Sequence, residues 1–284
     1  MKRRDFLIGS AAAAAAVATG TAQDIVALSK LERIGAMVNF PGLKSTRDWS
    51  QPIPPGPVDI MDVPDMLARQ YHIHNVEVQQ FHFLSMEPSY FEQFLGRLKK
   101  ANSRMTDMPL ELDVEPNGYS GTISPCSPDP QIRAHAVDLT KQWIDRAAMI
   151  ECPSVMINQG RNWPDDLTPI IDALKELRDY GASKNVAIIV EERGGIPIDR
   201  LVQLIKESGI NSNPDMGNFG DEQATETGLR LMYPLAKTVS HVKYNPERFN
   251  LEVAVAISKE QRFAGTYSIE GQIPVILPYL MMYL

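Results

Sequence analysis

Cysteine and net positive charge are both scarce in this sequence of 284 residues. Its two cysteines, Cys126 and Cys152, can form at most one bridge. This excludes a small fold held together by disulfides and leaves open whether the two cysteines pair. Lysine and arginine number 28 against 35 aspartates and glutamates, for a formal net charge of −7. An acidic surface repels phosphate backbones, so nucleic-acid binding is not expected as the main function.

Two common enzyme motifs and long hydrophobic runs are also missing. No Gly-x-Gly-x-x-Gly follows the first predicted strand, where Gly35, Gly42 and Gly56 are scattered, which disfavours a hydride-transferring dehydrogenase. The absence of a Gly-x-Ser-x-Gly elbow disfavours a serine hydrolase. Beyond residues 1–22, no stretch is long and apolar enough to predict a stable membrane span.

The first residues predict an export signal. A basic start (Lys2, Arg3, Arg4) precedes an apolar, alanine-rich run over residues 6–18, which is too short to remain as a membrane-spanning helix. Arg3 and Arg4, followed by Asp-Phe-Leu, resemble the twin-arginine export signal, which is read as an address and removed. An ordinary signal peptide and an uncleaved helix on a lipid surface are the alternatives. The resemblance implies transport of a periplasmic or secreted protein by the twin-arginine (Tat) machinery.

The rest of the chain, residues 23–284, alternates between predicted strands and helices. It holds 262 residues with a formal charge of −9. Short apolar or alternating runs predict eight strands, over residues 33–40, 75–83, 110–114, 154–159, 186–192, 210–215, 238–244 and 266–271. Apolar residues at helical spacing predict helices between them, among them 88–105, 129–150, 167–180, 198–208 and 225–236. Eight such units in about 250 residues are typical of a single-domain (β/α)₈ TIM barrel, with a doubly wound open sheet as the alternative.

The late strands end in polar side chains that share one face. Strand side chains alternate between the lumen of a barrel and its helix layer. In the fifth strand this alternation places Ala187, Ile189 and Glu191 inward. The same parity holds in the next three strands for the sets Asn211, Asn213 and Asp215; Val239, His241 and Lys243; and Thr266, Ser268 and Glu270.

Four of these residues are expected at the C-terminal mouth of the barrel, where such folds carry their active sites. They are Glu191, Asp215, His241 and Glu270, which follow one another at intervals of 24, 26 and 29 residues. Three carboxylates that converge repel one another unless a cation binds between them. Three carboxylates and an imidazole suit a divalent ion such as Mn²⁺, Mg²⁺, Co²⁺ or Zn²⁺, so the pattern predicts a metal site.

The sequence around these residues resembles the xylose isomerase-like barrels, which include sugar isomerases and epimerases, inosose dehydratases and the endonuclease IV group. The resemblance rests on four motifs in order: Val190-Glu-Glu-Arg-Gly-Gly195, Asn213-Pro-Asp-Met-Gly-Asn218, His241-Val-Lys243 and Tyr267-Ser-Ile-Glu-Gly271. Residues 75–78, Asn-Val-Glu-Val, resemble the family's second strand more weakly. The resemblance implies that Glu191, Asp215, His241 and Glu270 are metal ligands.

The motifs also depart from the family pattern. Glu192 and Arg193 stand where Asn and His are common, and Tyr244 replaces an Asp. The better-known relatives therefore do not reveal the substrate of this chain. The remaining histidines do not supply the extra metal ligands of endonuclease IV, which makes DNA repair an unlikely function.

A divalent ion in such a site supports carbon-acid chemistry. It can chelate a hydroxy-ketone, polarise the carbonyl and stabilise an enediolate, while Glu191 and Glu270 exchange protons with the two faces of one carbon. The roles assigned to the other residues are stabilisation of negative charge or of a substrate oxygen by Lys243, and substrate binding by Arg193, Asn218 and Asn158. Surface salt bridging is the alternative for Lys243 and Arg193.

The predicted function is therefore a divalent-metal-dependent isomerase or epimerase of a sugar or keto-sugar. Two alternatives stay open. The same residues support a metal-dependent lyase or dehydratase on keto-sugars or 3-keto-glycosides, because both reactions begin by proton abstraction beside a carbonyl. A non-catalytic sugar-binding barrel is the other alternative, and the presence of all four candidate ligands favours an enzyme. The sequence does not reveal the oligomeric state.

Overall fold

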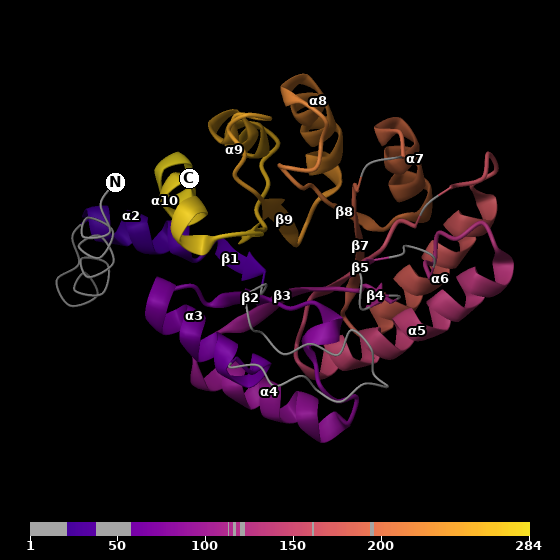
Figure 1. Cartoon of the computed structure of the whole chain (residues 1–284), viewed down its shortest axis with the longest axis horizontal. Coiled ribbons are helices and arrows are strands. Elements are labelled where there is room, and N and C mark those ends of the chain that lie inside the picture. The colour runs from indigo at the N-terminus through magenta and orange to yellow at the C-terminus, as the bar shows by residue number, and fades with distance from the viewer. Residues whose placement is uncertain are drawn as a thin grey trace.

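Eight parallel strands form a nearly closed barrel in the computed structural model, with helices around its outside (Figure 1). The structure describes residues 22–37, 58–112, 114–115, 118–119, 123–160, 162–193 and 196–284. The predicted export signal lies outside these residues except for Ala22. The barrel strands are β1 (Ile34–Met37), β2 (Asn75–Glu77), β3 (Arg104–Pro109), β6 (Ser154–Ile157), β7 (Ala187–Glu191), β8 (Asn211–Asn213), β9 (Val239–Val242) and β10 (Thr266–Ile269). The predicted single-domain TIM barrel is confirmed.

The helices pack their apolar faces onto the outside of the strands. They are α2 (Ala22–Leu31), α3 (Val63–Tyr71), α4 (Pro88–Lys100), α5 (Pro130–Met149), α6 (Thr168–Ser183), α7 (Ile198–Ser208), α8 (Glu222–Met232), α9 (Leu251–Glu260) and α10 (Ile273–Tyr283). Three single turns, η1 (Ile60–Asp62), η2 (Gln80–His82) and η3 (Tyr233–Leu235), and a hairpin of β4 (Val114–Glu115) and β5 (Gly118–Tyr119) complete the described elements. The first and last helices, α2 and α10, lie side by side (Figure 1), where the Lys30 ammonium donates to the Met281 carbonyl at 2.8 Å.

Side-chain caps fix where several helices begin. The Asp129 carboxylate accepts hydrogen bonds from the first-turn amides of α5, with Gln131 at 2.8 Å. Asp221 and Asn250 do the same for α8 and α9. Each such cap stabilises a helix by about 1 kcal/mol relative to alanine. The loops of the C-terminal mouth are therefore tied to well-defined helix starts.

The alternation of strand side chains agrees with the sequence pattern. Met156, Ile189 and Val239 form a small buried cluster of their own, separate from the main core. Their neighbours Ile188 and Val190 belong to the main core, which packs between the strands and the helices. Since residues at even spacing share a face, Glu191 and His241 lie on the inward side, as predicted.

The barrel closes where β8 and β9 meet, and we call this junction the seam. The sheet order runs β8-β7-β6-β3-β2-β1-β10-β9, so β8 and β9 are its two ends. An isolated parallel bridge joins Ser212 of β8 to Ala236, just ahead of β9, and a second joins Asp215 to His241. There the His241 amide donates to the Pro214 carbonyl and the Met216 amide donates to the His241 carbonyl, both at 3.1 Å. This contact closes the sheet into a barrel, which excludes the open doubly wound alternative.

The predicted third strand is wrong in position. It was expected at residues 110–114, whereas β3 runs from Arg104 to Pro109 and overlaps the expected end of the preceding helix. The helix ends at Lys100, because Asn102 adopts a left-handed conformation with φ 51°. The sequence pattern does not predict a strand here because it contains Asp107 and Pro109, and both residue types are depleted in strands. The second strand is shorter than predicted, because the chain turns into η2 soon after Glu77.

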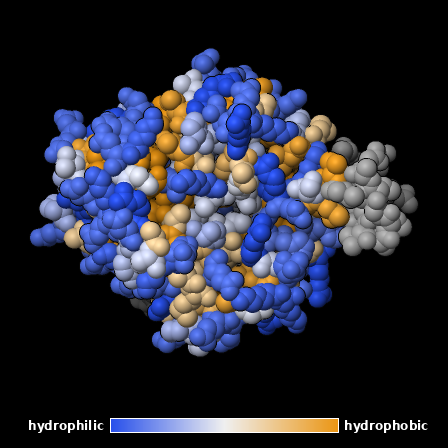
Figure 2. All heavy atoms as spheres, turned by 180° about the vertical axis from the view of Figure 1, so that it is seen from behind, coloured by the Kyte–Doolittle hydropathy of each residue, from blue (hydrophilic) through white to orange (hydrophobic). Residues whose placement is uncertain are grey.

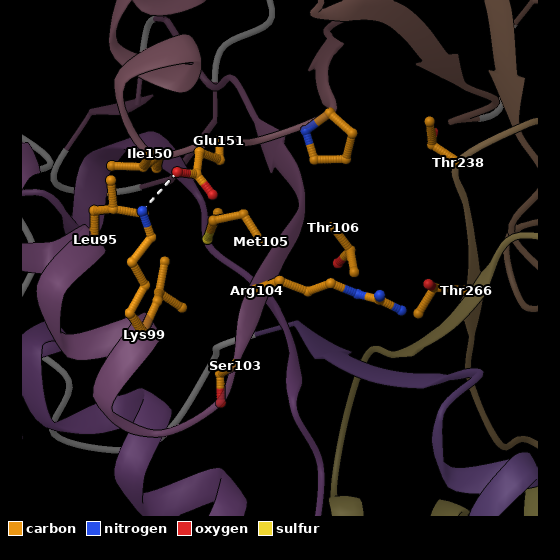
Figure 3. Close-up of a pocket in the computed structure, with 12 residues that line it drawn as sticks. Leu95, Lys99, Ser103, Arg104, Met105, Thr106, Ile150, Glu151, Thr238 and Thr266 are labelled. Carbon is orange, nitrogen blue, oxygen red and sulfur yellow. Dashed lines mark hydrogen bonds and ion pairs between the residues drawn. The ribbon is translucent and has the colours of Figure 1, made fainter.

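The end of the barrel opposite the mouth also holds a cavity, of about 450 Å³ (Figure 3). Arg104, Thr238 and Thr266 from the starts of strands line it, and the pair of Lys99 with Glu151 lies at its side. On the face shown in Figure 2 hydrophilic residues predominate, and hydrophobic ones form small separate groups. Among the described residues, none of the helices combines the length and hydrophobicity needed to cross a bilayer.

Candidate metal centre

The structure brings the four predicted ligands together at the C-terminal mouth. Glu191 ends β7, Asp215 and Glu270 follow β8 and β10, and His241 lies within β9. One ligand atom from each lies within 4.8 Å of the other three. Glu191, Asp215 and His241 are buried, and the Glu270 side chain is 25% exposed. We call these four residues the candidate metal centre.

The His241 imidazole lies between carboxylates on both of its nitrogens. Its Nδ1 is 2.6 Å from Glu191 Oε1 and 3.2 Å from Glu270 Oε2. Its Nε2 is 2.7 Å from Glu77 Oε1, a residue of β2 on the other side of the ring. Glu77 is fully buried. The imidazole thus presents Nδ1 to the candidate metal centre and uses Nε2 to hold a carboxylate outside it.

Lys243 is the second cation at the centre. Its ammonium is 2.6 Å from Asp215 Oδ2 and 3.3 Å from Glu270 Oε2. It also donates to Asn218 Oδ1 at 2.6 Å. The ammonium therefore bridges two of the candidate ligands from the solvent side, where it neutralises part of their charge.

Burial and charge change the pKa values of these groups in different directions. Burial alone would raise the pKa of Glu191, but the charges of His241, Arg193 and Lys243 hold it well below its ordinary value. Burial and the Glu191 charge raise the pKa of Asp215 to about 7. Burial would lower the pKa of His241, yet the carboxylates of Glu77 and Glu191 raise it well above its ordinary value. The carboxylates at both nitrogens therefore favour the imidazolium form of His241.

The residues present fit a divalent ion. Carboxylate oxygens and one imidazole nitrogen form a hard to borderline donor set. His241 and Lys243 lie among Glu191, Asp215 and Glu270, where positive charge offsets the repulsion of the carboxylates. The Nδ1 proton has to leave before this nitrogen can act as a ligand, and the Nε2–H remains on Glu77. The ligand roles stay a prediction that this geometry supports.

Arg193 lies beside the centre and pairs with two carboxylates. Its Nε is 2.9 Å from Glu191 Oε2, and its Nη2 contacts Glu111 Oε1. Glu191 and Glu111 are both buried, so this pairing is not a surface salt bridge, and substrate binding by Arg193 stays a prediction. Together with Glu191 and Glu270 of the candidate metal centre, Arg193 lines a cavity of about 300 Å³ at the barrel mouth, which we call the mouth cavity. Its lining residues are Met37, Gln79, Glu111, Glu191, Arg193, Asn218, Lys243 and Glu270.

The structure does not place all predicted substrate contacts in this cavity. Asn218 lines the mouth cavity, with its amide between the Lys243 ammonium and the Glu192 carbonyl. Asn158 is not part of its lining: the side chain is buried and accepts a hydrogen bond from the Gly160 amide at 2.8 Å. The amide at position 158 therefore stabilises its own loop.

Glu77 is the main residue that sequence reasoning missed. Its inward position follows from the parity it shares with Asn75 on β2, but nothing in the sequence indicates that it meets His241 across the lumen. Below it lies a second buried carboxyl, Asp107, which accepts a hydrogen bond from the Ser154 hydroxyl at 2.6 Å. Burial and the Glu77 charge raise the pKa of Asp107 well above its ordinary value. The lumen beneath the centre thus combines these polar groups with the apolar cluster of Met156, Ile189 and Val239.

The two cysteines do not pair. Both Cys126 and Cys152 are free and buried. Burial raises the pKa of the Cys126 thiol to about 12. A thiol with so high a pKa holds almost no thiolate at neutral pH, which excludes it as a nucleophile.

Several solved structures share this fold at low sequence identity. A 3-keto-D-glucoside 4-epimerase from E. coli, in its apo form, is 13% identical, with 88% of this chain and 99% of that chain covered and a TM-score of 0.65. A xylose isomerase-like TIM barrel protein from Mycobacterium smegmatis in complex with magnesium is 14% identical, with 88% and 96% covered and a TM-score of 0.63. A D-psicose 3-epimerase with D-tagatose from Clostridium cellulolyticum is 13% identical, with 76% and 80% covered and a TM-score of 0.62.

Identities this low show a shared fold, and no curated protein sequence matches the chain. A family description, in contrast, covers most of the sequence: that of the xylose isomerase-like TIM barrel matches residues 67–246. This span includes three of the four residues of the candidate metal centre, Glu191, Asp215 and His241, and stops before Glu270. The chain belongs to the xylose isomerase-like TIM barrel family.

Proposed function

We propose that the protein is a divalent-metal-dependent epimerase or isomerase of a sugar or keto-sugar. The observation that carries the proposal is the convergence of Glu191, Asp215, His241 and Glu270 within 4.8 Å at the mouth of the barrel. The structural neighbours support it, since two of them are sugar epimerases by their names and a third was solved with magnesium. A bound divalent ion would polarise a substrate carbonyl and stabilise negative charge on the neighbouring oxygen.

Glu191 and Glu270 are the proposed acid and base. They reach His241 Nδ1 from the ends of two different strands, Glu191 from β7 and Glu270 from just after β10, and in the proposal one carboxylate acts on each face of the substrate carbon. One carboxylate takes the proton beside the carbonyl, and the other returns a proton to the opposite face, which inverts the carbon. Each such step typically contributes roughly 10²–10⁴-fold to the rate. The lowered pKa of both carboxyls keeps them ionised at rest, so one can accept the C–H proton, while the other has to take up a proton from water or a substrate hydroxyl before it delivers one to the opposite face.

The cations around them hold the substrate oxygens and the carboxylates in place. Lys243 reaches Asp215 and Glu270 and lines the mouth cavity, where its ammonium can stabilise an oxygen that gains negative charge. Arg193 orients Glu191 through its Nε and fixes that carboxylate relative to Glu111. Its role in the proposal is therefore to position the base.

The test combines metal analysis with substrate screening. Metal content is measured for the wild type and for Glu270→Gln and Asp215→Asn, and keto-sugars and free sugars are screened by NMR and mass spectrometry. We expect about one divalent ion per chain, an epimer or isomer of unchanged mass, and loss of activity in both variants. Full activity of the metal-free variants would contradict the metal mechanism. A product that has lost water or an alcohol would favour the lyase or dehydratase instead.

We also propose that the protein is exported by the twin-arginine route, on the basis of Arg3 and Arg4 and the apolar run that follows them. Cell fractionation of the full chain and of a variant with Arg3→Lys and Arg4→Lys tests this. We expect the wild type in the periplasm or medium and the variant retained in the cytoplasm. Equal distribution of both would contradict the proposal.

A further inference from the structure

A second cavity, of about 470 Å³, borders the mouth cavity. Its walls come from the loop between β7 and α7 and from the segment between β8 and the first two turns of α8. Asn218 lines both cavities, so the two share one side chain as a common wall. We call this second space the outer cavity. It is larger than the mouth cavity, and the two meet at Asn218.

The outer cavity has an apolar wall with a fixed aromatic ring. Ile196, Ile198 and Phe219 line it together with polar residues. The Phe219 ring packs directly over Gly228 in the middle of α8, where a Cβ would lie 2.0 Å from Phe219 Cε1. Glycine inside a helix is unfavourable by roughly 0.5–1 kcal/mol relative to alanine. Gly228 therefore lowers the stability of α8, but any larger residue at this position would displace the Phe219 ring.

The loop that carries Phe219 is held at both ends. The Asp215 carboxylate accepts a hydrogen bond from the Gly217 amide at 2.7 Å. Arg248 donates to the Phe219 carbonyl at 2.8 Å. The Asn218 amide joins the Lys243 ammonium to the Glu192 carbonyl. These hydrogen bonds fix the wall, which reduces the entropy lost when a ligand binds.

The charges of the outer cavity select against anions. Carboxyl groups of Glu192 and Asp221 belong to its lining, and no lysine or arginine is among the described residues that line it. A phosphate or carboxylate group in this place would face the Asp221 carboxylate with no side-chain cation in the described lining to offset it. A flat apolar wall beside polar groups instead suits an uncharged ring, because a pyranose or an aromatic ring stacks one face on an aromatic side chain and leaves its edge to hydrogen bonds.

We infer that the outer cavity binds the second ring of an uncharged glycoside, whose first sugar ring lies at the candidate metal centre. The inference rests on the proposed function and narrows its substrate class from sugars in general to glycosides whose aglycone is a ring. An aryl group and a second sugar share the chemistry that the wall recognises. A free monosaccharide leaves the outer cavity empty, and a sugar phosphate would bring a charge that its lining repels.

The test compares substrates of different size on a variant that fills the outer cavity. The holoenzyme is assayed with a free keto-sugar and with its methyl, phenyl and glucosyl glycosides. Thr227→Trp places a large side chain on an exposed, cavity-lining position of α8 that contacts none of the proposed catalytic groups. Leu231→Trp is the matched control, since Leu231 lies one turn further along the same helix, is 39% exposed and is not part of the lining.

We expect the wild type to prefer the phenyl or glucosyl glycoside over the free and methyl forms by about tenfold or more in kcat/KM. Thr227→Trp should remove this preference through KM and leave turnover of the small substrates unchanged, while Leu231→Trp keeps the preference. The preferred glycoside identifies the aglycone as aryl or sugar. Equal use of all four substrates by the wild type, or an intact preference in Thr227→Trp, would overturn the inference and leave the proposed function standing.

If none of the sugars is turned over, the proposed function fails and binding alone decides the inference. Phenyl β-glucoside is then titrated into the wild type and both variants by calorimetry. Binding to the wild type and to Leu231→Trp that is lost in Thr227→Trp would support the outer cavity as a ring site. Absence of binding to the wild type, or equal binding to all three proteins, would overturn it.

Discussion

Glu77 determines which nitrogen of His241 faces the candidate metal centre. Its carboxylate is 2.7 Å from Nε2, so a neutral imidazole would keep its proton there and offer the Nδ1 lone pair to an ion. Carboxylate partners of this kind raise ligand basicity, and their loss typically weakens metal binding by about 10–100-fold. Glu77 is in this sense a positioning residue, because it acts through His241.

We expect Glu77→Leu to weaken metal binding by about 10–100-fold and Glu77→Gln to weaken it less, because the amide oxygen can still accept from Nε2–H. Metal affinity is measured by isothermal titration, together with thermal unfolding to confirm that both variants fold. Glu92→Gln, at an exposed position on α4, is the control. Equal affinities in Glu77→Leu and the wild type would show that Nε2 needs no carboxylate.

His241 also makes metal binding depend on pH. Its pKa lies well above the ordinary value in the metal-free protein, because Glu77 and Glu191 favour the imidazolium against the effect of burial. An ion at Nδ1 has to displace that proton, so apparent affinity should rise about tenfold per pH unit below this pKa. Asp215, with a pKa of about 7, adds a second proton to be released below neutral pH.

The heat of metal binding is measured in buffers of different ionisation enthalpy, and its dependence on the buffer gives the number of protons released per ion. We expect about one proton per ion at pH 8 and more than one at pH 6. An affinity that does not change with pH would show that His241 Nδ1 is not a ligand.

The positions of the four candidate ligands could be predicted from sequence because each follows from local information. Strand parity places Glu191 and His241 inward, and spacings of one βα unit bring all four to one end of the barrel. The contact of Glu77 with His241 depends on the distance across the lumen, which no local pattern encodes. The same is true of Arg193, whose pairing with Glu111 joins two loops that are far apart in sequence.

At the scale of elements, the prediction of the third strand failed because that strand contains residue types that are uncommon in strands. β3 contains Arg104, Asp107 and Pro109, residue types that favour turns and loops over strands. Its position is fixed by pairing with β2 and β6 and by the lumen contact between Asp107 and Ser154. Helix α7 has an apolar face at regular spacing and was predicted with its observed bounds, 198–208.

A substitution in helix α8 tests whether the contact with Gly228 holds the Phe219 ring in place. Gly→Ala inside a helix usually stabilises a protein by up to about 1 kcal/mol. In Gly228→Ala the new methyl group would overlap the Phe219 ring, with a Cβ 2.0 Å from its edge, so we expect a loss of about 1–3 kcal/mol instead.

Chemical unfolding of Gly228→Ala, Phe219→Ala and the double variant measures this coupling. The double variant should be more stable than the sum of the two single changes predicts, because the methyl group then fills space that the ring has left. Stabilisation by Gly228→Ala alone would show that the ring is free to move.

At the scale of the whole molecule, the candidate metal centre lies at the seam where the barrel closes, because the two share Asp215 and His241. β8 and β9 are the ends of the sheet, and one bridge between them joins Asp215 to His241, two of the four candidate ligands. β8 is short, and the seam also has the Ser212–Ala236 bridge and two hydrogen bonds that involve side chains, from the Ser240 hydroxyl to the Pro214 carbonyl and from the His241 amide to Asn213 Oδ1. An ion held by residues from β7 to β10 would therefore clamp the part of the barrel that backbone pairing holds least.

We expect metal binding to stabilise the whole fold for this reason. A free metal concentration of about 100 times Kd adds about 2.7 kcal/mol to the free energy of unfolding. For a protein of this size that corresponds to a rise in Tm of about 5–11 °C. Melting curves with EDTA and with Mn²⁺, Mg²⁺, Co²⁺ or Zn²⁺ measure the rise, and Asp215→Asn should lose most of it while Glu92→Gln keeps it.

Hydrogen exchange separates a clamp at the seam from general stabilisation. In the metal-free protein the amides of His241 and Met216 cross the seam, each with one backbone partner. Opening between β8 and β9 would expose them before the rest of the sheet unfolds. We expect metal to slow exchange of these two amides by a larger factor than it slows the paired amides of β6 and β7, whose ladder extends over four residues. Equal protection of all strands would mean that the ion stabilises the barrel without closing its seam.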